Sequence, residues 1–504
     1  MFESILFPPQ ATRPEPMVQP PAYFRDLGLD QIVETVTRSC DDPQLFFTPI
    51  RDRATILYRQ AIMGDLEDMT LRRRFAKLSS QLRTLRRQLI ARGQVKLEYV
   101  ECSSLLSAAE QYLTILREFT AGFPYGKIHS QGLTDFLRYI RHCLNSPQIV
   151  RMHMDLTDLS RKLQAVEYTI LLHNNKIQVA KPEEGQSLDK LVAELFDRFQ
   201  QENHGGGTCQ APAGEADPRN ENAILTLLAD HYPELFAQLR IFRADYEDFA
   251  DSRVIQLASD IQFYLSYLDY TDHMKDLACS FCYPEITETW EGCQADNSFD
   301  LALAARISEQ RESIVTNGFE LRGTERILVI SGPNQGGKTT YARMLGQLHY
   351  LASLGVRVPG SSAALRLPDR IFTHFVETGR QGADNLREEL LRLKEITEHA
   401  TEQSLILINE IFASVSHEDG LFLGNRMMER FTEIGCMAVC VTFFEELAVY
   451  SPQTVSMMSG ILPGPGAQRS HRITRQAPDG QAYALSLAEK KELTYEQIIR
   501  RLTQ

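Results

Sequence analysis

Apolar residues recur at steps of three and four along roughly the first 280 residues, and this spacing buries one face of a helix. The clearest stripe consists of Leu71, Phe75, Leu78, Leu82, Leu85 and Leu89. Residues 105–121, 133–145 and 223–280 carry similar spacing. The pattern therefore predicts a region of long helices.

Two segments interrupt this helical pattern. In residues 164–180, β-branched residues stand on both sides of Asn174 and Asn175, which predicts a β-hairpin that turns at the asparagines. Residues 203–222 include three consecutive glycines and two prolines without apolar periodicity, which predicts a flexible loop. The proline-rich stretch before residue 22 predicts an extended arm.

Near residue 300 the pattern changes again, and short apolar runs begin to alternate with helical segments. Such alternation predicts a mostly parallel sheet with helices against it. We expect a multidomain chain with an N-terminal arm and small helical segment in residues 1–70. Residues 71–300 are then a helical region, and residues 301–504 an α/β domain.

A glycine-rich loop between a predicted strand and a predicted helix carries the strongest chemical signal. Gly332, Gly337, Lys338 and Thr339 match the phosphate-loop (P-loop) pattern, in which backbone N–H groups face a polyphosphate at a helix N-terminus. Lys338 is expected to reach the β and γ phosphates of ATP, and the Thr339 hydroxyl to ligate Mg²⁺. The expected nucleotide-binding residues of this loop are Gly332, Pro333, Asn334, Gly336, Gly337, Lys338, Thr339 and Thr340. The alternative is a glycine-rich turn that binds nothing.

A second candidate segment is the apolar run of residues 405–408, which ends in Asn409 and Glu410. A buried strand that delivers acidic groups to its C-terminal end is typical of the second nucleotide motif, where an Asp holds Mg²⁺ and a Glu polarises water. Asn409 occupies the metal-side position here. Glu410 is the candidate base and, with Lys338, the candidate catalytic pair.

The charge distribution suggests one further site. The formal net charge is −13, yet no acidic residue falls between residues 71 and 97, where eight basic side chains follow the helix to residue 92. Arg83, Arg86 and Arg87 are our candidates for contacts with DNA phosphates. The alternative, equally weighted, is a solvated helix face that pairs with acidic neighbours.

Cysteine usage and hydropathy indicate the compartment. The nine cysteines are scattered and odd in number, which favours reduced thiols in a cytoplasm. Cys279 and Cys282 form a lone pair, too few for the three or four ligands of zinc. No apolar run approaches the ~20 residues needed to cross a bilayer, so we expect no membrane partner.

At this point the chain resembles a known family, the MutS DNA mismatch-repair ATPases. Residues 332–341 look like the family's phosphate loop, residues 399–410 like the run into its acidic motif, and residues 414–420 like the loop that follows. Further similar segments are residues 314–317, 369–373 and 483–488, with fainter ones at residues 24–32 and 58–62.

The resemblance implies an ABC-type ATPase domain in residues 301–504, in a homodimer with two composite nucleotide sites. Long lever helices would transmit nucleotide state to a clamp around double-stranded DNA, in mismatch repair or recombination. The segment at Ile314 and Val315 would flank the adenine. A less favoured reading, an ABC-type chromosome-maintenance protein, would need far longer heptad runs.

The sequence departs from the family at several points. The chain is too short to include the family's mismatch-reading domain, and we expect a short form. Asn409 replaces the metal-side Asp, Asp384 and Asn385 replace a Ser-Thr pair that reaches the partner's γ-phosphate, and Phe443 replaces a His. These changes predict weak ATP hydrolysis. The alternative function is a nucleotide-holding interaction scaffold with little or no hydrolysis.

Overall fold

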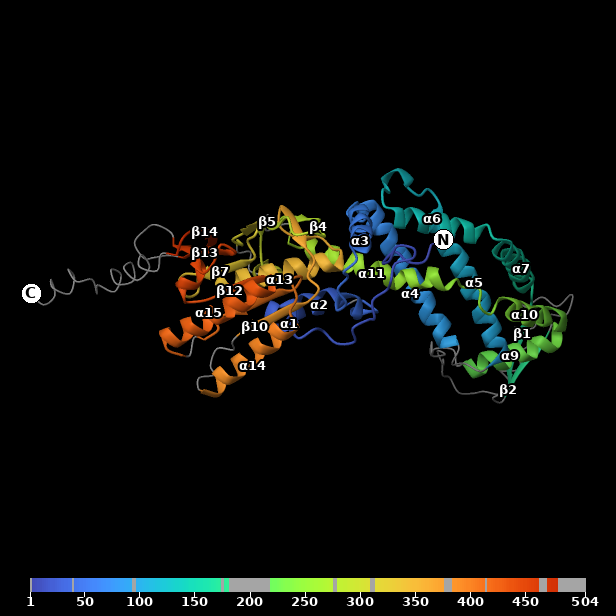
Figure 1. Cartoon of the computed structure of the whole chain (residues 1–504). Helices are drawn as coiled ribbons and strands as arrows, with labels where there is room; N and C mark the ends of the chain where they lie inside the picture. The colour runs from blue at the N-terminus through green and yellow to red at the C-terminus, as the bar shows by residue number, and fades with distance from the viewer. Residues whose placement is uncertain are drawn as a thin grey trace, which may run out of the picture. The chain divides into compact units, whose positions relative to one another are not determined.

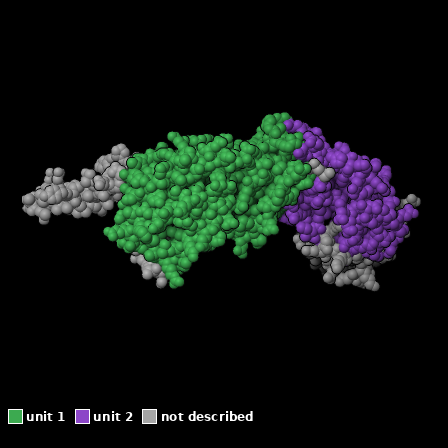
Figure 2. Space-filling view, viewed as in Figure 1, with its two compact units in different colours: residues 1–72, 126–134, 259–504 green, residues 73–125, 135–258 purple. Residues whose placement is uncertain are grey.

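The computed structural model divides the chain into two compact units, which Figure 2 colours separately. Unit 1 contains residues 1–72, 126–134 and 259–504, and unit 2 contains residues 73–125 and 135–258. The structure describes residues 2–38, 40–92, 97–173, 176–180, 218–274, 279–308, 313–375, 383–412, 415–461 and 469–478. This division differs from the three predicted segments, because residues 1–70 and 259–300 both belong to the unit that holds the α/β region.

A six-stranded sheet lies in unit 1 (Figure 1), with the strand order β10-β11-β12-β7-β13-β14. All neighbouring strands are parallel except the last pair, which confirms the predicted mostly parallel sheet. Every residue of β7, β11 and β12 is buried, as expected for a parallel sheet covered on both faces. The strands are β7 (Ile327–Ser331), β10 (Ile371–Phe375), β11 (Leu405–Asn409), β12 (Met437–Val441), β13 (Thr454–Ile461) and β14 (Arg469–Arg475).

Helices α14 (Ala383–His399) and α15 (His417–Ile434) pack with alternate residues of the central strands into one apolar core. Members of this core include Ile406, Ile408, Ala438, Cys440, Leu393, Ile396, Met428 and Phe431. Helix α13 (Lys338–Leu354) contacts β11 and β12, and almost all of its residues are buried. These helices remove the sheet from water on both faces, which is the main source of stability for such an arrangement.

The N-terminal segment is part of unit 1, because helix α1 (Tyr23–Leu27) packs directly on α13. A Cβ added at Gly346 of α13 would lie 2.5 Å from Cδ2 of Leu27, so any larger residue would require the Leu27 side chain to move. Gln347 Nε2 donates a hydrogen bond of 2.8 Å to the carbonyl oxygen of Leu27. The next elements of this segment are α2 (Leu29–Thr37), η1 (Pro43–Phe46) and α3 (Arg53–Asp65).

A second, four-stranded sheet has the order β4-β9-β5-β6, and its strand β9 follows β7 of the main sheet in the chain. Its strands are β4 (Glu285–Thr287), β5 (Gly292–Ser298), β6 (Asn317–Arg322) and β9 (Ser362–Arg366). Helix α12 (Leu301–Ser308) lies between β5 and β6 in the chain. A separate small pair is formed by β3 (Phe281–Cys282) and β8 (Val358–Pro359). Placing residues 281–298 in a helical region was therefore wrong. Strands of two to seven residues are too short to show a clear alternation.

Unit 2 is mostly helical, as the apolar spacing predicted. Leu71, at the start of α4, and Phe75, Leu78, Leu82 and Leu85 farther along it are at most 1% exposed. The long helices are α4 (Met69–Arg92), α5 (Glu98–Thr120), α6 (Gln131–Leu144), α7 (Pro147–Gln164), α9 (Pro218–His231), α10 (Pro233–Tyr246) and α11 (Ser252–Asp272), and a short η2 (Tyr125–Lys127) joins α5 to α6. Helices α4, α6 and α11 cross the division, so their residues 69–72, 131–134 and 259–272 belong to unit 1.

The predicted hairpin is confirmed by the antiparallel pair β1 (Thr169–His173) and β2 (Lys176–Ala180). Its asparagine turn lies outside the described residues. Most of the predicted loop at residues 203–222 also lies outside them. Its last five residues, 218–222, form the beginning of α9, so the predicted loop extended too far.

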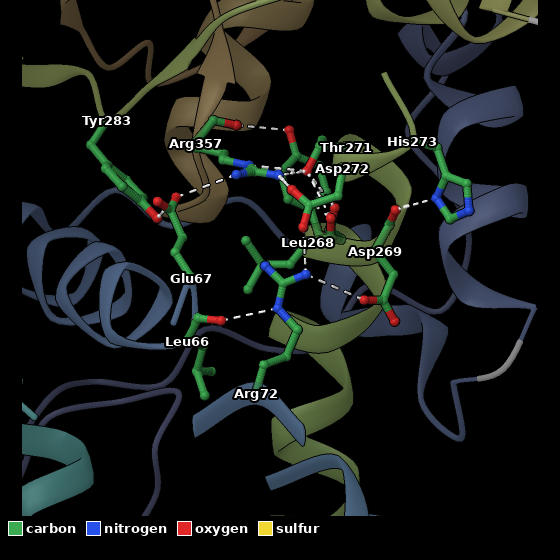
Figure 3. Close-up of polar contacts among 11 residues, drawn as sticks. Leu66, Glu67, Arg72, Leu268, Asp269, Thr271, Asp272, His273, Tyr283 and Arg357 are labelled. Atoms are coloured by element: carbon green, nitrogen blue, oxygen red, sulfur yellow. Dashed lines mark hydrogen bonds and ion pairs between the residues drawn. The ribbon is translucent and has the colours of Figure 1, made fainter. Parts of the chain in front are cut away.

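A buried polar cluster within unit 1 joins the start of α4 to the end of α11 (Figure 3). Asp272 accepts hydrogen bonds from Arg72 on one carboxylate oxygen and from Arg357 on the other, the latter at 2.6 Å. Arg357 also donates to Glu67 at 3.3 Å and to the Thr271 hydroxyl at 3.0 Å. The side chains of Arg72 and Arg357 are 7% and 3% exposed, so this shared carboxylate compensates two charges that water hardly reaches.

We expect Asp272→Ala to destabilise unit 1 by up to about 3–5 kcal/mol, because the two buried arginines then keep only the longer contacts to Asp269 and Glu67. Thermal and urea denaturation of the full chain would measure this loss. Glu398→Ala is the matched control, since it breaks an exposed ion pair with Lys394 on α14 and should change stability by at most about 0.5 kcal/mol. Equal midpoints for the two variants would contradict this account of the cluster.

Candidate nucleotide-binding site

The glycine-rich loop, residues 332–337, connects the C-terminal end of β7 to the first turn of α13. Three of its residues have positive φ: Gly332 (114°), Gln335 (61°) and Gly337 (93°). A left-handed conformation is strained for residues with a Cβ, so glycine is needed at two of these turns. The predicted strand, loop and helix around residues 332–339 are therefore all present.

Ser459 of β13 supports the loop from the neighbouring strand. Its hydroxyl donates a 2.7 Å hydrogen bond to the carbonyl oxygen of Gly336. A Cβ at Gly336 would lie 2.3 Å from that hydroxyl oxygen and 2.9 Å from the Pro333 carbonyl oxygen. Sequence reasoning missed Ser459, because it lies more than 100 positions from the loop and matches no motif.

Lys338 is 3% exposed, and its ammonium group donates to the loop's own carbonyl oxygens. The distances from Nζ are 2.8 Å to Gly332 and 3.2 Å to Pro333. The ring of Phe443 lies 4.8 Å from the same Nζ and is 43% exposed. Burial lowers the pKa of Lys338, the Glu410 carboxylate raises it, and the positive charge of Arg469 lowers it again.

The two predicted metal ligands, Thr339 and Asn409, are adjacent. The Thr339 hydroxyl donates a 3.0 Å hydrogen bond to Oδ1 of Asn409, which ends β11 and is 6% exposed. Two oxygens are thus available to a hard cation such as Mg²⁺, and they fit its preference for oxygen donors. Both are uncharged, so the protein would contribute little electrostatic attraction to the ion.

Glu410 lies at the same edge of the sheet, directly after β11, and adopts a φ of +57°. Phe412, two residues later, has a φ of +61°, which is an outlier for a bulky side chain. Glu389 of α14 holds this turn: its carboxylate accepts the Phe412 N–H at 3.1 Å and is 2% exposed, and burial raises its pKa. The predicted base is therefore held by a strained turn and a buried acid, and Glu389 was missed because it belongs to no recognised motif.

A cavity of about 240 Å³ opens beside the loop. Its lining brings the predicted pair Ile314 and Val315 together with Gly337 and Thr340 of the loop and helix. His471 of β14 also lines the cavity and was not predicted from the sequence. Asn317 holds His471 in place, since its amide donates to the His471 carbonyl oxygen at 3.1 Å and accepts from the Ile473 N–H at 2.8 Å.

Other predicted residues are not brought to this site. Arg83, Arg86 and Arg87 lie on α4 in unit 2, where Arg87 is exposed and the other two are half-buried. Nearby basic side chains are already engaged: Arg74 donates to carbonyls at the end of α5, and Lys77 pairs with Glu118 at 2.9 Å. This engagement favours the alternative of a paired helix face for part of the strip.

Some predicted residues lie outside the described structure, and the predictions about metal clusters and membrane spans concern only the described residues. Asp384 and Asn385 fall in the first turn of α14, but their side chains and residues 483–488 lie outside the described structure. Among the described residues, no three His, Cys, Asp or Glu side chains gather as metal ligands. No described helix is long and apolar enough to span a bilayer.

Gly336→Ala should destabilise unit 1 by about 1–3 kcal/mol, because the added methyl group overlaps the Ser459 hydroxyl and the Pro333 carbonyl. Adding Ser459→Gly should restore part of this loss, which is the coupling expected of residues in contact. Gly64→Ala in α3 is the control: no atom lies within 4 Å of its added Cβ, and it should be neutral or stabilising by up to about 1 kcal/mol. If Gly336→Ala behaves like Gly64→Ala in urea denaturation, the loop is not held as described.

Comparisons with known proteins agree with this geometry. Residues 328–492 match the family model of MutS domain V. The chain is 30% identical to "Endonuclease MutS2" of Thermus thermophilus, over 37% of this chain and 25% of that protein. It is 37% identical to "DNA mismatch repair protein msh-2" of Neurospora crassa, over 28% of this chain and 16% of that protein. It is 26% identical to "DNA mismatch repair protein MutS" of Bacillus pumilus over 51% of this chain and 31% of that protein. These matches span about a sixth to a third of each relative. Residues 328–492, which contain the loop and β11, therefore match a domain of the MutS family.

Proposed function

We propose that this protein binds ATP and Mg²⁺ in unit 1 and couples nucleotide state to DNA binding, in mismatch repair or recombination. The observation that supports this most is the joint placement of the glycine-rich loop, the Thr339–Asn409 pair and Glu410 at one edge of a buried parallel sheet. Ligands of open α/β sheets bind at the carboxyl ends of the strands. The region would then be an ABC-type ATPase domain, and the cell compartment the cytoplasm.

In this proposal the cavity beside the loop takes the adenine, and the loop N–H groups take the phosphates. Ile314, Val315 and His471 would enclose the base, since all three line the cavity. Lys338 would exchange the Gly332 and Pro333 carbonyls for phosphate oxygens, which are charged and therefore stronger acceptors. Magnesium, held by Thr339 and Asn409, would neutralise phosphate charge.

Hydrolysis would be slow, because the groups around the phosphate end are poor at activating water. Glu410 would hold the attacking water and take its proton. Asn409 adds no negative charge beside the metal, and the Phe443 ring over Lys338 offers no polar hydrogen. These two features also support the second candidate function, a scaffold that holds nucleotide with little or no turnover.

The assembly we propose is a homodimer with composite nucleotide sites. Asp384 and Asn385, at the start of α14, would then face the partner's nucleotide. The long helices α4 and α5 would form part of a lever and clamp around double-stranded DNA. Relatives named as mismatch repair proteins support this extension, as does the exposed Arg87 on α4.

Lys338→Ala should weaken ATP binding by about tenfold or more, because it removes a charge-assisted contact worth roughly 1.5–3 kcal/mol. Isothermal titration calorimetry of the full chain would measure the dissociation constant. Lys394→Ala, on the exposed side of α14, is the matched control and should bind as wild type does. Unchanged binding by Lys338→Ala would show that the loop is not the nucleotide site.

The rate of ATP hydrolysis separates the two candidate functions. Brisk hydrolysis by the wild type would exclude the scaffold, whereas hydrolysis that rises from near zero only in Asn409→Asp would favour it.

The DNA contact is tested by reversing the charge of Arg83, Arg86 and Arg87 together. If all three contact phosphates, the slope of log affinity against log salt should fall by about 2–3, because each contact contributes roughly 0.9. The matched control reverses Arg138, Arg151 and Arg161, which are exposed and paired with acidic neighbours in unit 2, and it changes the net charge equally. Homoduplex, mismatched and branched DNA are the probes. Equal slopes for the two triple variants would leave the strip as a solvated helix face.

A further inference from the structure

Arg469 is the first residue of β14, and its side chain reaches the glycine-rich loop. Its Nη1 atom donates a 2.8 Å hydrogen bond to Oε1 of Gln335, the residue at the turn of the loop. The preceding strand, β13, supports the same loop through the Ser459 hydroxyl. The loop is therefore held by two contacts from this side of the sheet, and one of them carries a positive charge.

Lys338 and Arg469 both contact the glycine-rich loop. Lys338 donates to the carbonyl oxygens of Gly332 and Pro333, and Arg469 donates to the side chain of Gln335. Repulsion between two cations at one loop is relieved when a polyanion binds between them. Arg469 is half-buried, which strengthens such an interaction relative to one in bulk water.

The predicted metal-binding side of the site lacks charge, in contrast to the loop with its two cations. Asn409 and Thr339 supply neutral oxygens and already satisfy one another at 3.0 Å. A cation placed there gains attraction from Glu410 and from the phosphates, but not from these two side chains. The site thus carries an additional positive charge at the loop and no negative charge at the Asn409 position.

We propose that Arg469 is a phosphate-binding residue, and that Lys338 and Arg469 together neutralise the polyphosphate so that nucleotide binding depends only weakly on Mg²⁺. This inference rests on the proposed nucleotide function and deepens it. Arg469 keeps its place through Gln335 and has further guanidinium N–H groups with which to reach a phosphate oxygen. Its role is in binding, and no step of hydrolysis is assigned to it.

The test is the dissociation constant of ATP, measured by calorimetry on the full chain with excess Mg²⁺ and with EDTA. For the wild type, removing Mg²⁺ should weaken binding by less than about threefold. Arg469→Ala should lose about tenfold or more in EDTA and only about threefold with Mg²⁺, because the metal then takes over part of the neutralisation. Asn409→Asp should increase the difference between the two conditions, since it restores a charged oxygen next to the ion.

Two further variants separate charge from loop architecture. Arg469→Lys keeps the charge without the planar guanidinium and should recover most of the binding in EDTA. Arg472→Ala removes an exposed arginine of the same strand, whose side chain has no hydrogen bond or ion pair within the described part of the chain, and should leave both constants unchanged.

Three results would overturn the inference. One is wild-type binding that disappears in EDTA. Another is an Arg469→Ala variant that matches Arg472→Ala in both conditions. A third is an Arg469→Ala variant that loses the same factor with and without Mg²⁺ and is not rescued by lysine, because that would indicate a structural support of the loop. If the wild type binds ATP in neither condition, the nucleotide function itself fails, and this inference with it.

Discussion

Helix α13 is buried on almost every side, and the other elements of unit 1 pack around it. Glycine permits close approach at two of its contacts: Gly346 meets Leu27 of α1, and Gly355, just after the helix, would place a Cβ 2.8 Å from Cβ of Arg59 in α3. Because buried helices of this kind are packed at the density of a crystal, α13 has little freedom to tilt or slide alone. Its N-terminal end carries Lys338 and Thr339, so the position of the loop is set by the packing of the whole helix.

The same packing explains why the N-terminal segment is not a separate body. Helix α1 and the residues around it provide one wall of the space that α13 fills, together with α3, α12 and strands β8 and β9. The first residues contribute as well: Ile5 and Leu6 are buried, and Arg59 donates to the carbonyl oxygen of Leu6 at 2.9 Å. A chain without these residues would expose the apolar side of α13 to water.

The glycine-rich loop, the end of β11 and the stripe on α4 could be predicted from the sequence, because each combines a local pattern with a known physical cause. Ser459, His471, Glu389 and Arg469 could not be predicted in the same way. Each reaches the site from a strand or helix distant in sequence, and its residue type is common on any surface. The predicted boundary at residue 300 failed for a related reason, since the strands of residues 281–298 are short and pair with β8 and β9, about 60–80 positions later.

The shared carboxylate of Asp272 has a consequence for how this protein can vary among its relatives. One aspartate compensates Arg72 and Arg357, which lie almost 300 positions apart in the chain and are both nearly inaccessible to water. Loss of the aspartate alone leaves Arg72 with Asp269 at 3.5 Å and Arg357 with Glu67 at 3.3 Å, both longer than the contact that Arg357 loses. A concerted change of all three side chains to apolar ones is a substitution that protein interiors often tolerate. Positions 72, 272 and 357 should consequently co-vary across a set of aligned sequences, with the three residues replaced together more often than one at a time.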